Sequence, residues 1–273
     1  MKQIHPWLRN LFYVGGLLSL VAGIQLFILS EQTETYFAWT IQSPLTAATF
    51  GGFYFGTMVF GFLSGREINW AHVRGPALGL LVFISVTLAA TLLHLDKFHL
   101  TSQNGLTMMV TWVWMLLYVL MPPMLIFMLI RQVRAEGNDP EPTLKISAWV
   151  RTLLLARGMA GSIAALLLFF TPQLIMPIWP WALTPLTSRV LSAWLISFSV
   201  VDWQAVWEND WQHLKIVAIG YIIFGLLGLI AMARYAGEVN WLSIGSIGYM
   251  IYLLSMVAVG VIGQMQTRRV NKG

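Results

Sequence analysis

Two short polar segments of the sequence carry the same residue types in the same order. Arg66–Arg74 reads REINWAHVR and Glu208–Lys215 reads ENDWQHLK, so that a Glu, a Trp and a His recur 141 positions apart. Each segment separates two long apolar runs, and we call the two segments the first and the second hinge. The recurring residues are Glu67, Trp70 and His72 in the first hinge and Glu208, Trp211 and His213 in the second. Because neutral imidazoles ligate metals and haem, His72 and His213 could together hold one cofactor. A plainer interpretation is that Trp anchors the membrane interface while His and the adjacent bases contact headgroups or cap helix ends.

The tryptophans near the second hinge support that plainer interpretation. Trp203, Trp207 and Trp211 are four residues apart, which predicts one aromatic stripe on a single helix face. We therefore expect Trp70, Trp203, Trp207 and Trp211 to anchor the protein at the membrane interface.

A second group of reactive residue types is the segment HLDKFH. It contains His94, Asp96, Lys97 and His99, and the corresponding segment after the other hinge, Tyr235–Asn240, has no histidine. Such a group can bind a metal, an anion or a haem propionate, or relay protons. As a zinc site the segment is weak, because histidines five residues apart do not share a helix face and no HExxH pattern is present. The alternative is a solvated outer loop with a local Asp96–Lys97 pair.

Two further features lie inside apolar segments. Pro122 and Pro123 each remove a backbone N–H and should free carbonyl groups near Tyr118, which can bind a cation or a polar ligand. Asp202 is an acidic residue inside an apolar run, where such residues are costly and indicate function. Tyr118, Pro122, Pro123 and Asp202 are thus the candidate lining of a cavity, although a proline kink fitted to neighbouring helices is the simpler alternative.

Catalytic motifs are missing from the sequence. It has no P-loop, no Rossmann glycine pattern, no GxSxG and no zinc-protease signature. It has no cysteine either, which excludes disulfides, thiolate nucleophiles and cysteine-ligated metals. The sequence therefore predicts no catalytic residue.

The composition assigns the chain to the membrane class. Hydrophobic residues make up 58% of it and charged residues 10%, whereas soluble chains carry roughly a quarter charged residues. The 13 Trp and 15 Phe suit aromatic belts at headgroup depth. The net charge of +5 comes from bases in short loops between apolar runs, which argues against nucleic-acid binding.

Eight apolar runs each approach the roughly twenty residues that a helix needs to cross the bilayer. They are Leu11–Leu29, Leu45–Leu63, Ala77–Leu95, Met108–Ile130, Thr152–Phe170, Ser188–Val206, Leu214–Met232 and Leu242–Ile262. Because lipid offers no partner for unpaired backbone groups, we expect an all-α, polytopic membrane helical bundle.

Several matches extend the repeat beyond the hinges. Trp7-Leu8-Arg9 matches Trp149-Val150-Arg151, Phe37–Thr46 matches Trp179–Thr187, and Tyr118, Gln132 and Arg134 match Tyr252, Gln266 and Arg268. The sequence therefore predicts a first half at 1–134, a linker at 135–144 and a second half at 145–273. Each half has four spans, so the two repeats should be parallel in the membrane.

The positive-inside rule predicts the orientation. With the N-terminus inside, thirteen basic residues lie on the cytoplasmic side, namely Lys2, Arg9, Arg66, Arg74, Arg131, Arg134, Lys145, Arg151, Arg157, Lys215, Arg268, Arg269 and Lys272. Three lie outside: Lys97, Arg189 and Arg234. We expect both termini and both hinges on the cytoplasmic face of the inner (plasma) membrane.

Two functional interpretations follow. In the first, the protein is a ligand-binding, transport or complex-forming membrane subunit with a cavity between its halves, and its partners are the bilayer and other membrane subunits. In the second, it is a subunit of an electron-transfer or photosynthetic complex. A haem or chlorophyll-type cofactor would then have His94, His99, His72 or His213 as an axial ligand, with Trp and Phe packed around the planar ring.

Overall fold

The computed structural model describes residues 1–270, and this range contains eight helices long and apolar enough to cross a membrane, as the sequence predicts. They are α1 (Pro6–Gly23, continued by a π-helical turn at Ile24–Ile28), α3 (Pro44–Arg66), α4 (Arg74–Leu92), α5 (Gly105–Arg134), α6 (Ala148–Phe170), α8 (Pro185–Glu208), α9 (Lys215–Arg234) and α10 (Ile244–Val270). The chain is therefore an all-helical, multi-pass membrane protein. Residues 271–273, including Lys272 and the end of the predicted second half, lie outside the described range.

The helix starts follow from the residues that precede them. Ser43 caps α3 by accepting a hydrogen bond from the Thr46 N–H at 3.1 Å, and Thr184 caps α8 in the same way. Proline is the first residue of both helices, a position where its missing N–H costs nothing. These caps explain why both helices begin before the apolar runs that hydropathy alone delimits.

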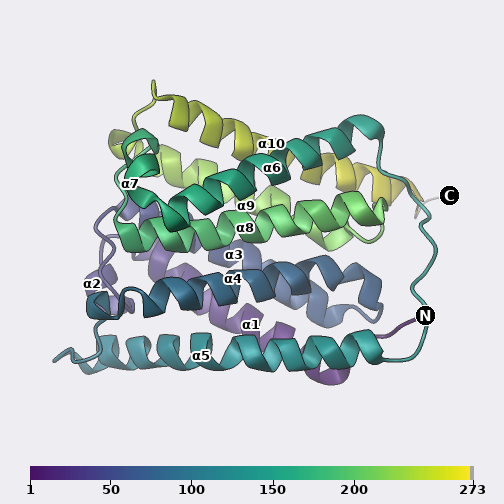
Figure 1. The fold of residues 1–273 in the computed structure, drawn as a ribbon, viewed down its shortest axis with the longest axis horizontal. Coiled ribbons are helices and arrows are strands. Elements are labelled where there is room, and N and C mark those ends of the chain that lie inside the picture. The colour runs from purple at the N-terminus through teal and green to yellow at the C-terminus, as the bar shows by residue number, and fades with distance from the viewer. Residues whose placement is uncertain (271–273) are drawn as a thin grey trace.

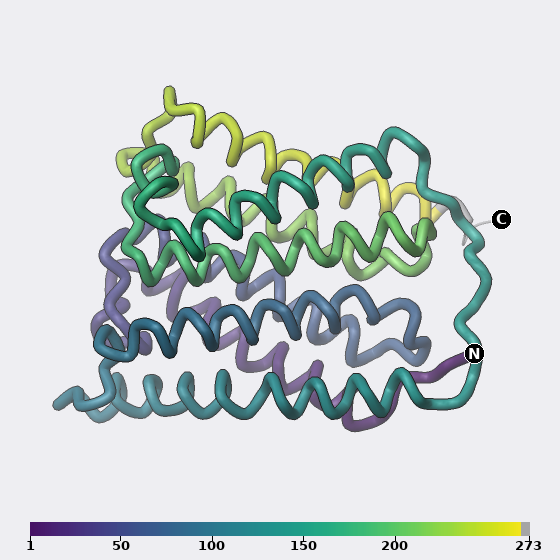
Figure 2. Tube along the Cα trace, in the orientation of Figure 1, coloured from purple at the N-terminus to yellow at the C-terminus, as the bar shows by residue number. Residues whose placement is uncertain are grey.

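Four central helices form the interior of the bundle. Between half and two thirds of the most apolar window is buried in α3, α4, α8 and α9, against one third in α1, α5, α6 and α10. α1 packs along α3 and α6 along α8, while α4 packs on α8 and α3 on α9. In Figure 1 the helices of residues 1–134 lie below those of the second half, and the linker between α5 and α6 runs along the end of the bundle where the N-terminus and the last described turns of α10 lie. Figure 2 follows this path along the backbone trace.

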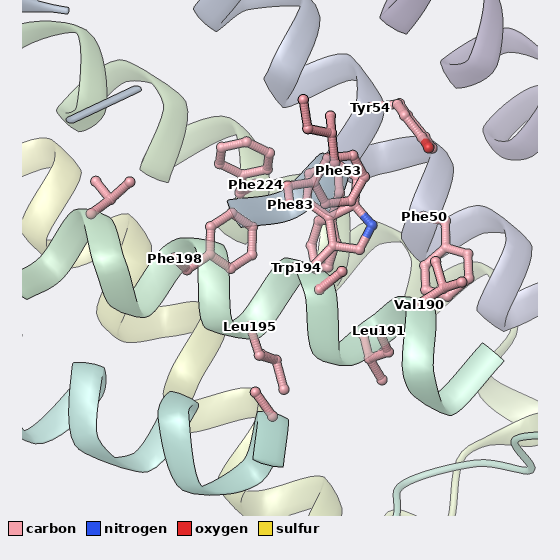
Figure 3. Close-up of a cluster of buried hydrophobic side chains, with 14 of the residues drawn as sticks. Phe50, Phe53, Tyr54, Phe83, Val190, Leu191, Trp194, Leu195, Phe198 and Phe224 are labelled. Carbon is pink, nitrogen blue, oxygen red and sulfur yellow. The ribbon is translucent and has the colours of Figure 1, made fainter. Parts of the chain in front are cut away.

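Aromatic side chains fill the centre where the two sets of helices meet. Phe83 of α4 and Trp194 of α8 lie 4.1 Å apart between ring centroids, and Phe198 and Phe224 lie 4.8 Å apart. Phe53 of α3 meets Trp194 edge-on at 5.4 Å. Figure 3 shows these rings pointing toward one another from four different helices. Such pairs each contribute about 0.5–1.5 kcal/mol beyond their buried area.

Glycine sets the close crossing of α1 and α3. A methyl group on Gly61 would lie 2.6 Å from the carbonyl oxygen of Phe12, a separation that real atoms do not adopt. Helices in lipid associate largely through such close packing of small residues. The absence of a side chain at Gly61 therefore fixes how near α1 approaches the centre.

Candidate functional site

A cavity of about 150 Å³ lies among α1, α3, α4 and α5 and reaches the central helices α8 and α9. One part of its wall is aromatic and includes Tyr54, Phe83, Trp114, Tyr118, Trp194 and Phe198. Another part consists of small residues, including Gly15, Gly16, Ser19, Gly61 and Ser64. Within the described part of the chain, none of the lining residues is charged. The cavity is thus an apolar slot between an aromatic wall and a small-residue wall.

A few polar groups interrupt this apolar lining. The hydroxyl groups of Tyr54 and Tyr118 are hydrogen-bonded to each other at 2.8 Å. Ser197 donates to the Gly79 carbonyl at 2.8 Å. The Ser64 hydroxyl and the Trp194 indole N–H are buried and have no hydrogen-bond partner among residues 1–270. Because buried polar groups are normally hydrogen-bonded, these two groups are exceptions among the polar groups of the lining residues.

The four predicted cavity residues have different positions. Tyr118 lines the cavity, and the two prolines lie about one turn further along α5, outside the lining. Pro122 is buried, Pro123 faces outward, and α5 continues through both. Asp202 also lies outside the lining, directly after Val201, which belongs to it. A ligand-binding role for Pro122, Pro123 and Asp202 stays a prediction.

Asp202 is half of a buried ion pair that the sequence reasoning missed. Arg157 of α6 donates through Nε to Asp202 Oδ2 at 2.8 Å, and a second contact joins Arg157 Nη2 to Asp202 Oδ1. The Tyr221 hydroxyl donates to Asp202 Oδ1 at 2.6 Å, and the guanidinium carbon lies 4.1 Å from the centre of the Tyr221 ring. Both charges are nearly inaccessible, with side-chain exposures of 2% and 0%. They persist in the bundle because each neutralises the other.

The assignment of Arg157 to a cytoplasmic segment is therefore wrong. Arg157 lies inside α6 and is buried, because Asp202 on the neighbouring helix compensates its charge. The sequence does contain a signal for this ion pair: Arg157 and Asp202 carry opposite charges and lie in two successive apolar runs. A count of basic residues by side of the membrane does not register this signal, because it assigns Arg157 to a loop.

The two hinges meet in a cluster of charged side chains. His72 Nδ1 lies 2.9 Å from Glu67 Oε2, and His213 Nδ1 lies 3.0 Å from Glu208 Oε2. Each carboxylate also forms an ion pair with a base of the other hinge: Lys215 Nζ lies 2.6 Å from Glu67 Oε1. Arg74 Nε donates to Glu208 Oε1, also at 2.6 Å. These crossed pairs tie α3 and α4 to α8 and α9 at one end of the bundle.

The charges of this cluster stabilise the ionised form of Glu67. Burial alone would raise the pKa of Glu67, but hydrogen bonds and charge from His72 and Lys215 hold it below its usual range. The rings of His72 and His213 lie 6.1 Å apart between centroids. No group of three or more His, Asp or Glu residues in the described range is arranged to hold a metal ion. A cofactor on the hinge histidines stays a prediction.

The histidines of HLDKFH have separate partners. His94 Nε2 lies 2.7 Å from Arg189 Nη1, while His99 contacts the Phe37 carbonyl at 3.2 Å and the Thr40 hydroxyl at 3.1 Å. Burial, reinforced by the charge of Arg189, lowers the pKa of His94, so its neutral ring can accept from the guanidinium. The expected local pair is confirmed, with Lys97 Nζ 2.8 Å from Asp96 Oδ2 on the exposed surface.

The tryptophan stripe expected along one helix does not form. α8 ends at Glu208, and Asn209 takes a left-handed conformation with φ of 50°, so Trp211 lies beyond the helix. Trp211 and Trp70 are buried in the hinges, whereas Trp203 and Trp207 are exposed on α8. Four-residue spacing fails here because Asn209, which tolerates positive φ, turns the chain. Headgroup anchoring by these four residues stays a prediction.

Comparison with protein-family models finds no match for this chain, and comparisons with curated proteins and with solved structures find none either.

Proposed function

We propose that this membrane protein binds a small apolar molecule, or the apolar end of a lipid-like one, in the cavity beside α1 and α5. The observation that carries this proposal is the aromatic and small-residue lining of a 150 Å³ space within the bundle. Ligand sites are mostly apolar, with a few polar groups that orient the ligand. A molecule in a cavity of this kind gains dispersion contacts with the surrounding side chains.

The size and the polar groups define the chemistry of the ligand. An apolar cavity of about 150 Å³ accommodates a molecule of about the size of benzene. Ser64 and Trp194 each offer a hydrogen-bond donor that has no partner among the described residues. A ring or short chain that carries a hydroxyl or carbonyl oxygen would satisfy such a group. A solute carrier, or a membrane-complex subunit that holds such a molecule, would use the same site.

The proposal includes an architecture: a tandem duplication with a first half at 1–134, a linker at 135–144 and a parallel second half at 145–273. Backbone hydrogen bonds that recur at the register of the repeat support it. Trp70 N–H donates to the Lys2 carbonyl at 3.0 Å, and Trp211 N–H to the Leu144 carbonyl at 2.8 Å. At the other end, His99 and Ala38 are joined in the same way as Asn240 and Pro180.

The crossed hinge pairs Glu67–Lys215 and Glu208–Arg74 support the same duplication, because the two pairs are equivalent to each other: each joins the glutamate of one hinge to the base at the end of the other. The excess of basic residues on the hinge side supports the proposed placement in the inner membrane with both termini cytoplasmic.

A quenching experiment tests the binding proposal. The purified protein in mild detergent is titrated with 4-bromobenzyl alcohol, whose bromine quenches tryptophan on contact. Because Trp114 and Trp194 line the cavity, we expect part of the fluorescence to be quenched saturably, above a linear background from partition. Ala22→Phe inserts a ring into the lining and should weaken saturable quenching about tenfold or more, a loss of about 1.4 kcal/mol or more. Val21→Phe, on the exposed side of the same turn, is the control.

The outcomes separate binding from partition. Linear quenching alone, identical in the wild type, Ala22→Phe and Val21→Phe, would exclude a binding site in this cavity. An unchanged elution volume on size-exclusion chromatography establishes that both variants remain folded.

The cofactor interpretation has one supporting observation, the 6.1 Å separation of the His72 and His213 rings. It predicts a Soret or red pigment band that disappears when His72 or His213 is replaced by alanine. His94→Ala and His99→Ala test the other two predicted ligands. A spectrum without absorption beyond the tryptophan band would leave the apolar ligand as the proposal.

A further inference from the structure

A polar network fills the interior of the second half. It joins one residue from each of four helices: Arg157 of α6, Asp202 of α8, Tyr221 of α9 and Tyr252 of α10. Arg157 is ion-paired with Asp202 and lies over the Tyr221 ring at 4.1 Å and the Tyr252 ring at 5.9 Å. Tyr221 donates to Asp202 at 2.6 Å. These side chains occupy the space where the four helices face one another.

The corresponding positions of the first half line the cavity. The match between Trp7-Leu8-Arg9 and Trp149-Val150-Arg151 aligns Gly15 with Arg157. The register of the hinges aligns Gly61 with Asp202 and Leu80 with Tyr221, and Tyr118 aligns with Tyr252. Gly15, Gly61, Leu80 and Tyr118 are all cavity residues.

Contacts between the helices support this alignment. A methyl group on Gly16 would lie 3.5 Å from the Cα atom of Gly61, and one on Gly158 would lie 3.4 Å from the Cβ atom of Asp202. The α1–α3 and α6–α8 crossings therefore bring equivalent residues together. The last spanning helix of each half, α5 in the first and α10 in the second, packs differently: α10 packs along much of α9, whereas α5 contacts α4 over a shorter stretch. The cavity lies beside this looser contact.

We propose that the ligand of the first half occupies the volume that the Arg157 side chain occupies in the second half, and that it is an uncharged molecule. This inference rests on the proposed duplication and cavity. Gly15 leaves the volume open, since a methyl group there would meet no atom within 4 Å. An ion in this cavity would lose its hydration without gaining a counter-charge, because no lining residue in the described range is charged. Neutral alcohols and carbonyl compounds with a ring or short chain are the class that fits.

Two substitutions test the position of the ligand. Gly15→Leu places a side chain where the second half has Arg157, and it should reduce saturable quenching by 4-bromobenzyl alcohol about tenfold or more. Val14→Leu, at an exposed neighbouring position, should bind like the wild type. Leu80→Tyr inserts the residue that the second half carries there and should also weaken binding. It is the second variant if Gly15→Leu does not fold.

A matched pair of probes tests the charge. At pH 7.5, 4-bromobenzoate carries a negative charge on nearly the same ring as 4-bromobenzyl alcohol, and we expect it to give no saturable quenching. Equal affinity for the two probes would overturn the uncharged class. If the wild type binds the alcohol, Ala22→Phe does not, and Gly15→Leu and Leu80→Tyr bind unchanged, the inferred position is wrong while the binding proposal stands. If the wild type itself shows no saturable quenching, the binding proposal is wrong.

Discussion

Replacing Asp202 with asparagine leaves the positive charge of Arg157 without its partner. The side chains are nearly isosteric, and the amide oxygen of asparagine can still accept from Tyr221, which now donates to Asp202 at 2.6 Å. The main change is therefore electrostatic. Removing one partner of a buried ion pair costs about 3–5 kcal/mol, because the remaining ion stays desolvated. Since Arg157 has 2% of its side chain exposed, we expect Asp202→Asn to destabilise the bundle by about that amount.

A double-mutant cycle isolates the pair. Arg157→Met alone leaves Asp202 buried and charged, so it should cost about as much as Asp202→Asn. The double variant removes both charges and retains similar volume, and we expect it to lie within about 2 kcal/mol of the wild type. The coupling energy between the two sites should therefore reach several kcal/mol.

The free energy of unfolding can be measured by titrating the protein from mild detergent into SDS and recording far-ultraviolet circular dichroism. Asp96→Asn is the matched control, since Asp96 makes an exposed pair with Lys97 and its loss should leave the transition unchanged. Additive single-variant effects, or an Asp202→Asn transition equal to that of the wild type, would refute the buried, mutually compensating pair.

Other positions give sharper local tests. Glu67 has a pKa lowered in the folded state, so the stability it contributes is complete above its unfolded pKa of about 4.3 and is lost as the pH falls through the folded value. Glu67→Gln should therefore make the free energy of unfolding depend less on pH in the acidic range, as measured by SDS titrations at several pH values. Asn209 has φ of 50°, so Asn209→Ala should cost about 1–2 kcal/mol whereas Asn209→Gly should cost less, and equal losses in thermal melts would contradict a strained cap. Tyr54→Phe leaves the Tyr118 hydroxyl without its partner and should cost about 1–3 kcal/mol, with the Tyr54→Phe/Tyr118→Phe double variant closer to the wild type in the same melts.

The spanning helices could be predicted because a long run of apolar residues directly indicates a segment that is surrounded by lipid rather than water. The run Met108–Ile130, for example, contains no charged residue, and it lies wholly within α5. Helix ends depend on single caps instead. Pro44 and Pro185 begin α3 and α8 because Ser43 and Thr184 provide acceptors, and hydropathy does not register either residue.

The hinges could be identified from sequence, but their pairing could not. The recurrence of Glu67 and Glu208 marks two equivalent segments, and each glutamate does contact the histidine five residues later. The longer-range partners are exchanged between hinges, with Lys215 on Glu67 and Arg74 on Glu208. That exchange depends on which helices touch, and the order of spans along the chain does not specify it.

The cavity was hard to predict because it is defined by side chains that are missing. Motif reasoning looks for residues that do something, such as Asp202 or Pro122, and it passes over glycines in an apolar run. Gly15 and Gly61 become informative only when they are set beside Arg157 and Asp202 in the other half. Under the proposed duplication, the half that lacks Arg157 also lacks Asp202, as expected because one member of a buried charged pair is costly without the other. In a duplicated membrane protein, a position where one copy has a compensated charge and the other has a glycine with open space beside it, as at Arg157 and Gly15, is therefore where a cavity should be sought first.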